Sequence, residues 1–237
     1  MQTYHCIVLS TLRYKDNDLI IRAFSREIGL VSFIHKGAYK PKKGSAKAAF
    51  YQVLSQNLIS TSAKNNDLKT VTDVTSNYLY TSLYTNVFKS SIAMFLSEVL
   101  TSSIREEHQN ISLFEFLETA FTYLDLSDHF ANFHLFFLVK LTKFLGFYPD
   151  FSNESPDSFN LRTGKFELNL QDNYVIEGES AFFMKAFLKS DFESYGLVKM
   201  NSKQRNDFLI NLLLYFELQL IDFRHPKSLE VLNTLFS

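Results

Sequence analysis

The chain has 237 residues, 46% of them hydrophobic, and a formal net charge of −1 at pH 7, values typical of a globular protein with one or two domains. Its single cysteine, Cys6, excludes an internal disulfide and a zinc cluster built from cysteines. No apolar run approaches the roughly 20 residues that a membrane span requires, and the first residues lack the layout of a signal peptide, so a cytoplasmic protein is expected.

The charge is distributed unevenly along the chain. Residues 1–50 carry nine basic and three acidic side chains, whereas the other 187 residues carry 15 basic and 22 acidic ones. This asymmetry predicts an anion-binding face near the N-terminus, and nucleic acid is the large anion that such a face most commonly binds.

Residues 1–78 are predicted to form a small β domain. Short apolar runs between turn residues are typical of strands. Five such runs occur, at 4–12, 18–25, 30–35, 52–60 and 69–75. Five short strands with one long loop at 37–50 predict a closed barrel, and five is the strand number of the OB-fold.

Residues 79–237 are predicted to form an all-α domain, because the apolar spacing changes to the helical period. Ile92, Phe95 and Val99 lie on the apolar stripe of a first helix. Ser112, followed by Glu115, is expected to cap a second helix that reaches about residue 124. A third should run from about 128 to Gly146.

The remainder of this domain is predicted as a small insert followed by three helices. The insert covers about 150–176 and contains a hairpin at 159–168, around Thr163 and Gly164. Helices are expected at 179–188, 202–223 and 228–236, with Ser202 and Ser228 as N-caps. The expected fold class is therefore α+β and multi-domain, with an OB-like barrel ahead of a helical domain.

No catalytic constellation is visible in the sequence. Lys43-Gly44-Ser45 lacks the upstream glycine of a phosphate-binding loop. Ser127, Asp128 and His129 are adjacent, which favours a cap of the third helix over a catalytic triad. The histidines show no metal-ligand spacing. We expect a protein that is not an enzyme and that has no metal or other cofactor.

The segment 36–50 is the sharpest local signal for binding. Five lysines lie in it with two glycines and Pro41, so its backbone can follow an irregular phosphate chain without reading bases. Tyr39 offers a ring for stacking, whereas Phe24 and Phe33 on the flanking strands are expected to lie in the core. The predicted DNA-binding residues are Arg13, Arg22, Arg26, Lys36, Tyr39, Lys40, Lys42, Lys43 and Lys47.

Three other interpretations of these residues remain open. The β domain of a helical interaction scaffold could bind acidic proteins through the same cations, or the barrel could bind RNA. A solvated loop above a core of aromatic residues is the neutral interpretation of the segment.

Three stretches, in order, resemble the RecO family of bacterial DNA repair proteins. Residues 7–42 resemble its N-terminal pattern, which ends in a K-G-A-R-K/R loop where this chain has Lys36-Gly-Ala-Tyr-Lys. Leu145-Gly-Phe-Tyr-Pro-Asp is similar to its L-G-Y-x-P-x-L motif, and residues 223–232 are similar to its C-terminal motif.

The resemblance implies an N-terminal OB-fold and a recombination mediator of the RecF-pathway type. Such a protein binds single- and double-stranded DNA, anneals complementary strands, and helps RecR to load RecA onto strands coated by single-stranded DNA-binding protein (SSB). In this family the helical domain receives the acidic C-terminal tail of SSB. The matching basic positions here are Lys140 and Lys143.

The chain departs from many members of that family in one place. They carry a four-cysteine zinc element after the L-G-Y-x-P motif, whereas residues 151–166 contain no cysteine here. The insert is therefore expected to hold no metal and to be fixed by packing.

Overall fold

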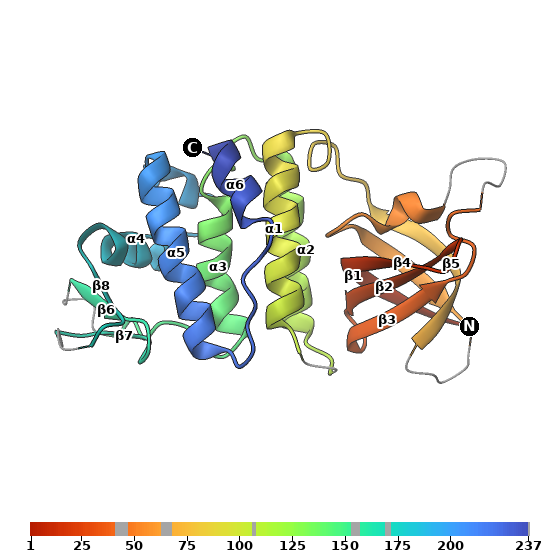
Figure 1. Ribbon diagram of the computed structural model, residues 1–237, viewed down its shortest axis with the longest axis horizontal. Coiled ribbons are helices and arrows are strands. Elements are labelled where there is room, and N and C mark those ends of the chain that lie inside the picture. The colour runs from red at the N-terminus through yellow and green to blue at the C-terminus, as the bar shows by residue number, and fades with distance from the viewer. Residues whose placement is uncertain (41–46, 63–67, 106–107, 153–156, 169–171, 237) are drawn as a thin grey trace. The chain divides into compact units, whose positions relative to one another are not determined.

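The computed structural model describes residues 1–40, 47–62, 68–105, 108–152, 157–168 and 172–236. Its described elements run from a five-stranded barrel through helices and a small sheet to further helices (Figure 1). The chain divides into two compact units, Met1–Leu126 and Ser127–Ser237.

The first unit begins with the predicted closed barrel, which is OB-like. Its strands are β1 (Gln2–Tyr14), β2 (Asp18–Ser25), β3 (Gly29–His35), β4 (Gln56–Thr61) and β5 (Leu68–Tyr78). Their order around the barrel is β1-β2-β3-β5-β4, and only the β3–β5 pair among them is parallel. A short 3₁₀ helix, η1 (Lys47–Tyr51), precedes β4.

The fourth strand begins at Gln56, so the predicted start at residue 52 is wrong. Leu54 adopts a left-handed backbone with φ of +63°, and its N–H donates to Val8 O at 2.7 Å. The N–H of Ser55 also donates back to Gln52 O at 3.1 Å. These bonds turn residues 52–55 before the ladder of β4 starts.

Alternation along the strands fills the barrel with apolar side chains. Phe33 is fully buried there, with its ring centroid 5.9 Å from that of Tyr4. Phe24 points from the outer side of β2 and is also fully buried, 6.5 Å from the ring of Phe114. Both rings are therefore core residues, as expected, and neither offers a surface for stacking.

Two helices complete the first unit, α1 (Val87–Ser103) and α2 (Ile111–Leu126). The stripe that predicted α1 is confirmed, since all its members are fully buried. The cap predicted at Ser112 is wrong: α2 begins at Ile111, and Asn110 Oδ1 accepts the N–H of Leu113 at 3.0 Å. The side-chain amide of Asn110, and not the hydroxyl of Ser112, therefore caps this helix.

The end of α2 is clamped to the segment between β5 and α1 by Asp125. Its carboxylate accepts the N–H groups of Thr81 at 2.9 Å and of Ser82 and Leu83 at 2.7 Å. Burial alone would raise the pKa of Asp125, but these donors outweigh it and hold the pKa below its usual value. Lys89, almost fully buried, donates to Asp125 O at 2.7 Å.

The second unit is mainly helical. Its helices are α3 (Phe133–Phe144), α4 (Gly178–Lys189), α5 (Ser202–Gln219) and α6 (Leu229–Phe236), with a 3₁₀ turn η2 (Tyr195–Leu197). The third helix starts five residues later than predicted. Ser127 Oγ accepts the N–H of His129 at 3.1 Å, so this run forms a turn of its own and does not cap α3.

Two ends of these helices also differ from expectation. Asn201, not Ser202, caps α5, through a capping box with Gln204. That helix stops at Gln219, four residues before the predicted end. The stop of α3 is as predicted, because Gly146 has a φ of +85° and the N–H of Phe147 donates to Thr142 O at 3.1 Å.

The insert is a three-stranded sheet of β6 (Ser158–Asn160), β7 (Lys165–Phe166) and β8 (Val175–Glu177), in the order β7-β6-β8. The predicted hairpin turn is confirmed, with Gly164 at a φ of +69°. Buried Asn160 donates to Glu167 Oε1 at 2.7 Å and to Asp172 Oδ2 at 3.2 Å. These hydrogen bonds add to the packing that was expected to hold the insert.

Candidate nucleic-acid interface

Four of the six predicted cations that the structure describes lie at one end of the barrel. There β1 ends, β2 begins and β3 ends, because both hairpins bring these strand termini together. We call this region the basic end, and it consists of Arg13, Lys15, Lys36, Lys40 and Lys47. All five side chains are exposed. Lys42 and Lys43 belong to the same predicted site but lie outside the described residues.

Backbone bonds fix the segment after β3 against the turn between β1 and β2. The N–H of Gly37 donates to Asp18 Oδ1 at 2.8 Å, and the N–H of Tyr39 donates to Asn17 O at 3.2 Å. Gly37 has a φ of +70°, a conformation that favours glycine. The chain then turns so that the N–H of Lys40 donates to Gly37 O at 3.0 Å. These contacts place Tyr39 beside Arg13, and Lys36 and Lys40 lie in the same segment.

Two tyrosine rings lie among these cations. The guanidinium carbon of Arg13 is 5.1 Å from the ring centroid of Tyr39, and Arg13 also donates to Asp16 O at 2.9 Å. The ammonium of Lys15 is 5.3 Å from the ring centroid of Tyr14. Tyr14 and Lys15 were not among the predicted site residues. Their position at the end of a strand, directly beside Arg13, was the signal that could have included them.

Lys47 lies at the basic end but shares its charge with an acid. Its ammonium is 3.4 Å from Asp73 Oδ1 and 5.5 Å from the ring centroid of Phe50. The 3₁₀ helix that carries Lys47 is tied to the segment after β3, since the N–H of Ala48 donates to Ala38 O at 3.1 Å. Burial, with the nearby Lys47 charge, lowers the pKa of His35, so this imidazole adds no positive charge at neutral pH.

The two remaining predicted arginines lie away from this cluster. Arg22 is in the middle of β2, on the outer wall, between Ser10 and Ser32 on the neighbouring strands. Arg26 follows β2 at the opposite end of the barrel. Its guanidinium is 2.7 Å from Glu115 Oε1 on α2 and 6.0 Å from the ring centroid of Phe114. The structure thus does not bring Arg26 to the basic end, and its charge is paired with the helix.

In the second unit, the two predicted partner-binding lysines differ in their surroundings. Lys140 is half-buried and donates to Leu188 O at 2.9 Å, at the C-terminal end of α4, where a cation complements the helix dipole. Burial lowers the pKa of Lys140, while Asp191 opposes that shift. Lys143 is exposed. Only Lys143 therefore presents its full side chain to an incoming anion.

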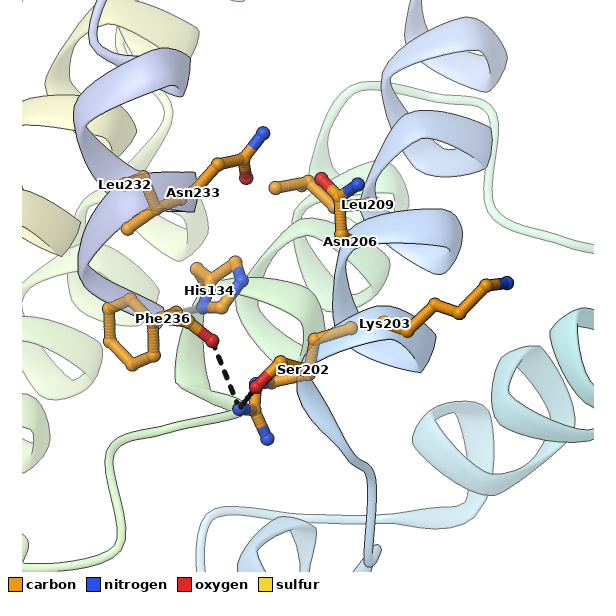
Figure 2. Close-up of a pocket in the computed structure, with 9 residues that line it drawn as sticks. His134, Ser202, Lys203, Asn206, Leu209, Leu232, Asn233 and Phe236 are labelled. Carbon is orange, nitrogen blue, oxygen red and sulfur yellow. Dashed lines mark hydrogen bonds between the residues drawn. The ribbon is translucent and has the colours of Figure 1, made fainter.

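A cavity of about 230 Å³ lies between α3, α5 and α6 in this unit (Figure 2). Arg205 lies in it and donates to Met200 O at 2.7 Å, Ser202 Oγ at 3.2 Å and Phe236 O at 3.4 Å. These bonds hold the end of α6 to the start of α5. Burial, with a smaller effect of Arg205, lowers the pKa of His134 to about 3, so this buried imidazole is neutral.

Two further findings concern the part of the chain that the structure describes. No group of three or more His, Cys, Asp or Glu side chains among those residues could hold a metal ion. No helix there is long and apolar enough to cross a membrane.

Comparison with known proteins agrees with the architecture. Residues 1–79 match the family model described as "Recombination protein O N terminal", and residues 84–229 match "Recombination protein O C terminal". Proteins named "DNA repair protein RecO" are 41% identical in Christiangramia forsetii, over 97% of both chains, and 37% identical in Flavobacterium johnsoniae, over 98% of this chain and 97% of the relative. A third, from Phocaeicola vulgatus, is 33% identical over 98% and 97%. The chain belongs to the RecO family of DNA repair proteins.

Proposed function

We propose that this protein is a recombination mediator of the RecF-pathway type. It binds single- and double-stranded DNA, anneals complementary strands, and helps RecR to load RecA onto strands coated by SSB. The observation that supports this best is the group of cations fixed at one end of an OB-like barrel. Binding and annealing break no covalent bond, so we propose a protein that is not an enzyme.

The proposed mechanism is electrostatic. Cations of the basic end, with Arg22 on the wall and Lys42 and Lys43 of the following loop, neutralise phosphates on two strands at once. This lowers the repulsion between the strands and lets base pairing proceed. Arg26 contributes by anchoring the barrel to α2, because its guanidinium is already paired with Glu115.

The two parts of the chain have different roles in this proposal. The β domain, residues 1–78, binds DNA, and the helical domain, residues 79–237, receives protein partners. For the acidic tail of SSB, Lys143 supplies the accessible charge, and Lys140 adds positive potential from the end of α4.

The test is the rate at which complementary oligonucleotides anneal, measured with donor and acceptor dyes. Replacing Lys42, Lys43 and Lys47 with Glu should slow annealing and weaken DNA binding together. If both stay unchanged, the assignment of the loop is wrong. Competition with single-stranded RNA and with an acidic peptide separates DNA binding from the RNA-binding and acidic-protein interpretations. If either competitor displaces labelled DNA at a lower concentration than unlabelled DNA does, that competitor, and not DNA, represents the preferred ligand.

A further inference from the structure

The two tyrosine rings at the basic end are not explained by packing. Tyr14 and Tyr39 expose 41% and 37% of their surface, and neither belongs to the core of the barrel. Each lies beneath a cation, Arg13 for Tyr39 and Lys15 for Tyr14. A ring, an adjacent cation and open solvent together are the features of a surface that stacks on a base and contacts its phosphate.

The Tyr39 ring is held in position before any ligand arrives. Its backbone N–H is bonded to Asn17 O, and the guanidinium that covers it is itself fixed by Asp16 O at 2.9 Å. Gly37, two residues earlier, is anchored to the Asp18 carboxylate. A surface that is already ordered loses little conformational entropy on binding, so stacking free energy is converted into affinity efficiently.

The Tyr14 pair carries a second sign of functional constraint. Lys15 is not glycine, yet it adopts a left-handed backbone with φ of +53°. That conformation turns the chain between β1 and β2 and accompanies the placement of the Lys15 ammonium over the neighbouring ring. Backbone strain of this kind concentrates at functional sites.

We propose that Tyr39 and Tyr14, each with its cation, form a stacking platform for unpaired bases, which makes the basic end selective for single-stranded DNA. This inference rests on the proposed DNA-binding function and adds to it the form of DNA that the site prefers. Lys36 and Lys40, which are exposed in the same segment as Tyr39, contact the phosphates that flank the stacked base.

The selectivity follows from which surfaces the two forms of DNA expose. In a duplex both faces of an internal base are covered by its neighbours, so a tyrosine ring can reach only the phosphates beside it. In a single strand the base can leave the stack and lie on the ring. Lysines attract the phosphates of both forms, whereas the rings add affinity for single strands alone.

The first experiment compares variants on single- and double-stranded oligonucleotides of the same length. Stacking on one ring contributes about 1–3 kcal/mol, and a partly covered ring should lie in the lower part of that range. Tyr39→Leu should therefore weaken single-strand binding about five- to thirtyfold and change duplex binding less than twofold. Tyr39→Phe keeps the ring and should bind like the wild type, and Tyr14→Leu should act in the same direction as Tyr39→Leu.

The second experiment reports stacking directly. The chain contains no tryptophan, so Tyr39→Trp introduces a single indole fluorophore. Saturating oligo-dT should quench its emission strongly, and saturating duplex should leave it nearly unchanged. The matched control is Tyr148→Trp in the second unit, where the replaced ring is 39% exposed and the emission should not respond to either form.

The outcomes separate this inference from the proposed function. If Tyr39→Leu weakens both forms of DNA equally, or weakens neither, and the Tyr39→Trp emission is insensitive to oligo-dT, the platform is refuted while DNA binding stands. If the wild type binds neither form at low salt, the proposed function itself fails. Selective loss of single-strand binding with selective quenching supports the platform.

Discussion

Replacing Asp125 with Ala should destabilise the first unit severely, because this carboxylate satisfies three backbone N–H groups at once. The donors belong to Thr81, Ser82 and Leu83, at 2.7–2.9 Å, and Asp125 itself is only 2% exposed. A buried donor left without a partner costs about 1–3 kcal/mol. Water can hydrogen-bond to the N–H groups of Thr81 and Ser82, which are only partly buried. We therefore expect a loss of about 3 kcal/mol in the free energy of unfolding.

The Asp125→Asn variant refines this expectation. It keeps one carbonyl oxygen of the same shape, so at least one of the three donors stays paired, and the loss should be about half as large. For a chain of this size 1 kcal/mol corresponds to about 2–4 °C in Tm. Asp125→Ala should therefore lower the Tm of the first transition by about 6–12 °C, and Asp125→Asn by about 3–6 °C.

Differential scanning calorimetry is the suitable assay, because two units need not unfold in one step. Asp157→Ala serves as a control, since its carboxylate lies on an exposed surface, where it pairs with Lys185 at 3.1 Å. If Asp125→Ala shifts the transition by less than 2 °C, or no more than the control does, the segment between β5 and α1 does not depend on this carboxylate. The role assigned to Asp125 would then be refuted.

Three further predictions concern single side chains. Gly37→Ala places a Cβ at a φ of +70° and 3.2 Å from the flexible Lys40 side chain, so it should cost about 1–2 kcal/mol in urea unfolding and displace Tyr39; no loss would mean that the turn is relaxed. The pKa of His134 is lowered to about 3 in the folded protein. Between about pH 6.5 and 3 only the unfolded chain binds the proton, so stability should fall as the pH drops through this range. His134→Phe should flatten that part of the pH profile measured by thermal melts, and an unchanged profile would refute the prediction. Lys140→Met removes a donor from the end of α4, so it should lower the free energy of unfolding by about 1 kcal/mol and lower the Tm accordingly. Lys143→Met should leave the Tm unchanged. Equal effects of the two substitutions would contradict the different surroundings of the two lysines.

The barrel could be predicted from the sequence because its strands carry local signals. Short apolar runs between turn residues located all five strands. The start of β4 was missed since Leu54 turns the chain in a left-handed conformation that leucine rarely adopts, and the bonds that hold it reach across to β1. No pattern in a short window encodes such a contact.

Helix starts were predicted less accurately than helix positions. Where short polar residues follow one another, as at Asn110 and Ser112 or at Asn201 and Ser202, each could cap the helix by composition alone. The backbone geometry decides between them, and it selected the asparagine in both cases.

The sequence indicated which segment carries the cations but not how they are arranged. The charge count identified the N-terminal segment, yet it could not tell which cations are paired. Arg26 meets Glu115, and Lys47 meets Asp73, through contacts between residues that are 89 and 26 positions apart. The direction of β2 alone would have placed Arg26, which follows this strand, at the end of the barrel opposite to Arg13. This argument was available from the sequence.

The most direct test of the central claim is the salt dependence of single-stranded DNA binding, measured by fluorescence anisotropy. If about six phosphates are neutralised, the logarithm of affinity should fall with the logarithm of salt at a slope of about −4, and replacing Lys36, Lys40 and Lys47 with Gln should flatten that slope by about 2. The same replacement at Lys165, Lys199 and Lys203, all exposed in the second unit, changes the net charge equally and should leave the slope unchanged. Equal slopes for the two triple variants would contradict the assignment of the basic end as the DNA-binding face.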